Sequence, residues 1–189
     1  MRVDETDRRR LMVGSISVAA APEEDPPFPV EAAIREEDSW LVLSSRAGPV
    51  LKAEAGSLEQ AVADLESFVP ITPGRALVRT GMPLEILAVV HDLSREPSWR
   101  EEWIAEALHA ALAEAELREI SSLSVPLLGG MHGRFPDDAI CHLLVDELSR
   151  LQPRHIRYLW VRSPAGESRR ALEAADMLRE IAQRGIQRP

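Results

Sequence analysis

The chain has one cysteine and no long apolar run, and each shortage excludes a class of protein. Cys141 has no second cysteine for an internal disulfide, so a disulfide-stapled secreted scaffold is excluded and a reducing compartment is expected. No stretch approaches the roughly 18 apolar residues of a membrane span, and the opening MRVDETDRRR precedes no apolar signal core. We therefore expect a cytoplasmic protein without a membrane partner, in which residues 1–10 form a charged tail.

Basic residues are also in deficit, since 22 lysines and arginines face 31 aspartates and glutamates, for a net charge of -9. This balance argues against broad electrostatic binding of nucleic acid, although a local basic pocket could still hold a phosphate. The usual nucleotide fingerprints GxGxxG and GxxxxGK[ST] are absent, which does not exclude a nucleotide. The lone cysteine and the spacing of the histidines predict no metal and no cofactor. The histidines are His91, His109, His132, His142 and His155.

Length and pattern predict one α/β domain over residues 11–185. Strands are expected at residues 11–21, 39–44, 75–80, 85–93, 120–128 and 155–162, the third and fourth forming an antiparallel pair. Helices are expected after the capping-box spacings Ser57 to Gln60 and Ser98 to Glu101, from Asp137 or Asp138, and from Ser163 with Pro164. This order predicts a three-layer α/β/α sandwich with a mixed sheet, which favours ligands outside the carboxyl ends of its strands.

The second half resembles a macro domain, a family of ADP-ribose-binding modules. The resemblance rests on ITPGRALV from Ile71, AVVHD near His91, SLSVPLLGGMHG up to Gly133, and the closing strand RHIRYLWVR with its helix. In that family the third piece is a strand that runs through proline into a glycine-rich phosphate loop. The resemblance implies a macro-like fold and ADP-ribose or a related nucleotide as ligand.

In the family, the first ligand loop consists of an asparagine-rich turn and a triple-glycine segment. This sequence departs from that pattern, because it reads LSSRAGPVL there. The resemblance places Ser44 and Ser45 near the asparagine turn, with Arg46 next to it. The residues at the positions of the glycine segment follow Arg46. Hydroxyl and guanidinium groups suit a ribose and a phosphate, whereas the alternative is a degenerate strand end. The missing asparagines place catalysis in doubt. The residues that replace the glycines are Gly48, Pro49 and Val50.

The second ligand loop is the stronger signal, because glycines let backbone N–H groups approach a phosphate beside the positive end of a following helix. The alternatives are a plain connection and, for His132, an exposed loop histidine instead of a phosphate donor. This loop is one residue shorter than the family pattern, so Met131 or His132 could narrow the groove. The predicted ligand residues here are Gly129, Gly130, Met131, His132 and Gly133.

The adenine contacts of the family have no single counterpart. An acidic residue could come from Glu23, Glu24 or Asp25, and the usual aromatic is replaced near Val161 and Arg162, with Trp160 adjacent. An alternating strand turns neighbours to opposite sides, so Trp160 and Val161 cannot both face the ligand.

Two pairs of sequence neighbours have the residue types of catalytic pairs, but their expected orientations do not suit catalysis. His91 and Asp92 would face opposite sides of a strand, and neighbours such as Cys141 and His142 do not face each other on a helix. The leading hypothesis is therefore a noncatalytic macro-type module for ADP-ribose or a related nucleotide diphosphate. The alternatives are a degenerate macro-fold scaffold with a protein partner and a weak hydrolase of ADP-ribosyl esters.

Overall fold

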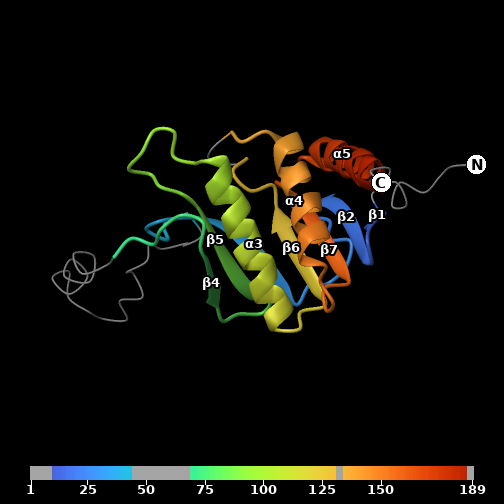
Figure 1. The fold of residues 1–189 in the computed structure, drawn as a ribbon, viewed down its shortest axis with the longest axis horizontal. Coiled ribbons are helices and arrows are strands. Elements are labelled where there is room, and N and C mark those ends of the chain that lie inside the picture. The colour runs from blue at the N-terminus through green and yellow to red at the C-terminus, as the bar shows by residue number, and fades with distance from the viewer. Residues whose placement is uncertain (1–9, 44–68, 131–133, 187–189) are drawn as a thin grey trace, which may run out of the picture.

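A seven-stranded mixed sheet forms the centre of the structure, a computed structural model that describes residues 10–43, 69–130 and 134–186 (Figure 1). The strand order is β1-β2-β7-β6-β3-β5-β4. The five central strands are parallel, and the edge strands β1 and β4 pair antiparallel with their neighbours. The ends of β2, β7, β6, β3 and β5 therefore share one edge, here named the carboxyl edge. The strands are β1 Arg10–Val13, β2 Ile16–Pro22, β3 Ala32–Asp38, β4 Ala76–Arg79, β5 Leu84–His91, β6 Ser122–Pro126 and β7 Tyr158–Ser163.

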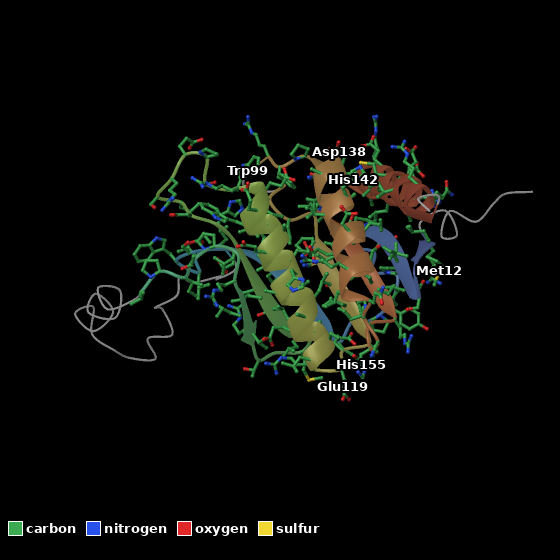
Figure 2. All side chains as sticks on the ribbon, viewed as in Figure 1. Met12, Trp99, Glu119, Asp138, His142 and His155 are labelled. Atoms are coloured by element: carbon green, nitrogen blue, oxygen red, sulfur yellow. The ribbon has the colours of Figure 1, made fainter. Side chains whose placement is uncertain are left out.

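Three helices lie side by side on one face of this sheet: α3 (Glu101–Leu117), α4 (Asp137–Leu151) and α5 (Ser168–Ile186). Figure 1 shows α3 in front of β5, α5 over β1 and β2, and α4 between the two. Their amino-terminal ends lie at the carboxyl edge, where Figure 2 places Trp99, just before α3, and Asp138, at the start of α4. The positive ends of three helix dipoles therefore point toward that edge.

Strand register explains how the core forms beneath these helices. Val18, Leu159 and Leu123 lie in one row across β2, β7 and β6, and all three are fully buried. Ile34 and Ile86 continue the same face on β3 and β5. Apolar side chains at alternate positions of parallel strands thus form one continuous surface for the helices, and burial of this surface stabilises the fold.

The predicted first strand is two strands. β1 and β2 form a hairpin whose register, Val13 opposite Ile16, leaves only Gly14 and Ser15 in the loop. Gly14 has φ 57°, a backbone conformation that is costly for residues with a Cβ atom. Because apolar residues lie on both sides of Gly14, the pattern predicted one continuous strand.

The predicted strand at residues 39–44 was wrong, because the strand lies earlier, at β3. Four of the last residues of β3 are charged (Arg35, Glu36, Glu37 and Asp38), a composition that pattern reading assigns to a loop. The described residues after it, 39–43, form a turn. The physical reason is that the carboxylates of β3 have partners inside the fold, which are described below.

The other elements follow the predictions more closely. The antiparallel pairing of β4 with β5 is confirmed, as are α3 and the start of α4 at Asp137. The Ser98 to Glu101 capping box was wrong, since Arg100 is the N-cap residue of α3 and no side chain caps that end. The last helix begins at Ser168, and the Ser163 hydroxyl donates to the Glu167 carbonyl instead. The helix predicted after Ser57 lies outside the described residues up to position 68.

None of the described helices is long and apolar enough to cross a membrane. The cysteine lies on α4, where its side chain is only 1% exposed. Burial raises the pKa of the Cys141 thiol to about 12, and the nearby Asp137 and Asp138 carboxylates add to the shift. Since the thiolate is the reactive form, we classify Cys141 as an inert core residue.

We expect native protein at pH 8 to show no fast reaction with Ellman's reagent, because the thiol is both covered and protonated. The same protein in guanidinium chloride should release one equivalent of the coloured thiolate. Complete modification of the folded protein within the time of mixing would contradict the burial of Cys141.

Candidate functional site

Three acidic side chains lie buried at the end of β3, on the carboxyl edge. Glu36 is 8% exposed, and Glu37 and Asp38 are fully buried. A buried carboxylate is costly unless it is hydrogen-bonded or paired. The Asp38 carboxylate accepts hydrogen bonds from the backbone N–H groups of Trp40 (2.6 Å), Val42 (2.9 Å) and Leu43 (3.1 Å). These bonds fold residues 39–43 around the carboxylate.

A β-bulge brings His91 to the same side as Glu36. In the register of β3 with β5, Glu36 lies opposite Ala88, but Asp38 lies opposite His91, so β5 has one extra residue there. A bulge of this kind redirects the side chain that follows it. Nε2 of the fully buried His91 lies 2.6 Å from Oε1 of Glu36. The pair therefore joins the ends of two adjacent strands.

The second oxygen of Glu36 holds the loop that follows β6. Oε2 accepts the backbone N–H of Gly129 at 2.8 Å. Gly129 has φ 75°, and a Cβ atom there would lie 2.7 Å from Cδ1 of Ile104 and 2.9 Å from Cβ of Phe135. Only glycine fits this backbone position without strain and displacement of the core.

The next residue, Gly130, lies beside an arginine from another helix. Its N–H donates to the carbonyl of Leu127, and a Cβ atom on it would lie 2.8 Å from Nη2 of Arg170. The Arg170 guanidinium forms two hydrogen bonds with Asp137, at 2.6 and 2.7 Å, and a third with Glu167 at 3.0 Å. In the described part of this loop, both glycine N–H groups thus have protein acceptors, and the neighbouring cation is paired with two carboxylates.

No family model and no curated protein matches the sequence, whereas solved structures match the fold. A variant of the Oceanobacillus iheyensis macrodomain is 15% identical, with a TM-score of 0.64 over 94% of this chain and 97% of that one. The macro domain of ganglioside induced differentiation associated protein 2 has a TM-score of 0.58 at 15% identity, over 90% and 85%. The chain has the macro-domain fold. The Trypanosoma brucei macrodomain in complex with ADP matches at 0.56 and 12% identity, over 84% and 68%.

The α/β/α macro fold with a mixed sheet is thus confirmed through the solved macrodomains that it matches, and the three described helices form the layer on one face of the sheet. Of the predicted ligand residues, the structure describes Gly129 and Gly130 and places both at the carboxyl edge. The others lie outside the described residues: Ser44, Ser45, Arg46, Gly48, Pro49, Val50, Met131, His132 and Gly133. β3 ends at Asp38, and the described turn that follows it covers residues 39–43, before Ser44.

The acidic candidates after β2 tie that strand to β7. The N–H of Glu23 donates to the Ser163 carbonyl, and the Glu24 carboxylate accepts the N–H of Gly166 at 2.9 Å. Oε1 of Glu23 lies 3.1 Å from Nη1 of Arg162. The loops that follow β2 and β7 therefore form one unit at the carboxyl edge.

The buried Arg162 guanidinium bonds to the backbone of β3. Strand register places Pro126 of β6 opposite Arg162, and proline has no N–H to donate to β3. The Ile34 carbonyl accepts Nη2 of Arg162 at 2.6 Å instead. Burial, with the nearby Arg35, lowers the pKa of Arg162 to about 10, so the side chain stays charged near neutral pH. We therefore assign Arg162 a structural role.

The acidic end of β3 was not predicted from the sequence, where its only signal is the run of charge directly after Ala33 and Ile34. The expectation that His91 and Asp92 face apart is confirmed, because the imidazole contacts Glu36 whereas the Asp92 carboxylate accepts the N–H of Ser94 at 3.1 Å. Among residues 10–43, 69–130 and 134–186 no cluster of three or more acidic, histidine or cysteine side chains could hold a metal.

Glu36→Ala should lower the free energy of unfolding by about 3–5 kcal/mol, because His91 and the Gly129 N–H lose their buried acceptor. Glu36→Gln keeps one amide oxygen and should cost about 1–3 kcal/mol. The measurement is urea denaturation followed by circular dichroism. Glu173→Ala, which removes an exposed i,i+4 pair with Arg169, is the control and should cost about 0.5 kcal/mol or less. Equal losses for the control and Glu36→Ala would contradict the role of Glu36.

Proposed function

We propose that this macro-fold chain binds ADP-ribose or a related nucleotide diphosphate at the carboxyl edge. Solved neighbours support the ligand class: one is an Oceanobacillus iheyensis macrodomain variant with ADPR, and two others contain ADP. Within this chain, the observation that carries the proposal is the glycine loop after β6, which Glu36 anchors at Gly129 ahead of the amino terminus of α4. A fixed glycine loop before a helix amino terminus suits a phosphate group.

We propose binding without cleavage of the ADP-ribosyl bond. The acidic and imidazole groups at the end of β3 and β5 are used within the protein. Both oxygens of Glu36 are hydrogen-bonded, Asp38 accepts three backbone N–H groups, and His91 has no exposed surface. Neither carboxylate can activate a water against a ribose without first breaking its own contacts.

A second function is a macro-fold scaffold that has no nucleotide site. Two observations favour it: the N–H groups of Gly129 and Gly130 already have acceptors, and Arg170 is paired with Asp137 and Glu167. A diphosphate would have to compete with those carboxylates. The experiment below separates the two functions.

The proposal is tested by calorimetric titration of folded protein with ADP-ribose at low ionic strength, with ADP as a second ligand. Saturable binding in the micromolar range is expected. Gly130→Glu should abolish it, because the new side chain places a negative charge beside Arg170 and within the glycine loop. Release of ADP-ribose from an ADP-ribosylated protein should stay at the uncatalysed rate.

Ser15→Glu is the matched control, since it adds the same charge at an exposed position of the β1–β2 hairpin, on the side of the sheet opposite the carboxyl edge. It should bind ADP-ribose like the unmodified protein. Thermal unfolding verifies that both variants are folded. Absence of heat with folded, unmodified protein would refute the nucleotide module and support the scaffold.

A further inference from the structure

We propose that Ser98, His91 and Glu36 form a nucleophile, a base and an orienting carboxylate that hydrolyse small acyl esters. This activity goes beyond nucleotide binding and uses none of the predicted nucleotide-loop residues. The array differs from the rejected pair of His91 with its neighbour Asp92, because its members come from β3, β5 and the segment before α3.

The three side chains are connected through the two nitrogens of one imidazole. Oγ of Ser98 lies 3.5 Å from Nδ1 of His91, and Nε2 of the same ring lies 2.6 Å from Oε1 of Glu36. The first distance is at the outer limit of a hydrogen bond, and such contacts shorten in a reacting complex. A hydroxyl, an imidazole and a carboxylate in this order are the components of the serine hydrolase triad, which recurs on unrelated folds.

The pattern of burial matches the proposed roles. His91 and Glu36 are buried, whereas Ser98 is partly exposed and can meet a substrate. The Gly129 N–H fixes the far oxygen of Glu36, so the carboxylate cannot rotate away from the imidazole. A base held by a buried carboxylate and a nucleophile open to solvent is the arrangement that nucleophilic catalysis needs.

The neighbourhood of Ser98 also favours the reaction. Ser98 does not cap α3, so its hydroxyl is not committed to the helix end. The first hydrogen bond of α3 runs from the Ile104 N–H to the Arg100 carbonyl. The N–H groups of Glu101, Glu102 and Trp103 therefore have no acceptor within the helix, and no side chain caps this helix end. Such N–H groups are the type of donor that stabilises a developing oxyanion.

The reaction is an ordinary two-step ester hydrolysis. With Nε2–H donating to Glu36, Nδ1 accepts the Ser98 proton while Oγ forms a bond to the acyl carbon. The bond from that carbon to the alcohol oxygen then breaks, and His91 returns the proton to the leaving alcohol. A water that enters where the alcohol left then gives a proton to His91 and bonds to the acyl carbon. The bond from that carbon to Oγ breaks, and His91 returns the proton to Ser98, which frees the acid. No oxidant, reductant or metal is required.

The proposal is tested with a fluorophosphonate probe, which phosphonylates an activated serine and is located by intact mass and peptide mapping. The expected result is one adduct, on Ser98, together with slow hydrolysis of p-nitrophenyl acetate. Ser98→Ala should abolish the adduct. Glu36→Gln, studied well below its melting temperature, should label at least about 100-fold more slowly, the usual contribution of an oriented base.

Ser94→Ala is the matched control, because Ser94 lies in the same loop and its hydroxyl contacts Asp92, not the imidazole. It should label like the unmodified protein, while near-ultraviolet circular dichroism shows that every variant retains its fold. The proposal is overturned if the folded protein gives no adduct, if the adduct lies on another residue, or if Glu36→Gln labels at the unmodified rate. These results do not depend on whether ADP-ribose binds.

Discussion

The buried carboxylate of Glu36 holds together three segments that are distant in the chain. One oxygen meets His91, 55 residues away, and the other meets the N–H of Gly129, 93 residues away. The end of β3, the bulged end of β5 and the loop after β6 therefore depend on one side chain. Removal of such a group costs more than its contacts contribute, because two polar partners would remain buried without an acceptor.

This interaction also underlies both functions that we propose for the carboxyl edge. The bond that anchors the glycine loop occupies the Gly129 N–H, so a phosphate bound as proposed would need other donors of the loop and helix. The same contact that buries His91 orients its second nitrogen toward Ser98. Nucleotide binding and ester hydrolysis, as proposed here, thus both depend on the buried Glu36 carboxylate but use different surface groups.

Much of the architecture could be predicted because apolar periodicity is a local property. The β4–β5 hairpin, α3 and α4 each carry their pattern within a short stretch, and the glycine loop after β6 was recognised through its family context. The end of β3 could not be predicted, because the partners that make three acidic residues tolerable in a buried strand come from β5 and from two loops. The hairpin at Gly14 was missed for a simpler reason, since a two-residue turn inside an apolar run leaves only one glycine as a signal.

The most direct test of the account is amide hydrogen exchange of Gly129, measured by NMR on the folded protein. If Glu36 holds the loop, this N–H is protected and exchanges only when the site opens, at a rate well below that of an unstructured peptide. Exchange of Gly129 at the unstructured rate, in a protein whose core strands remain protected, would contradict the central role of Glu36.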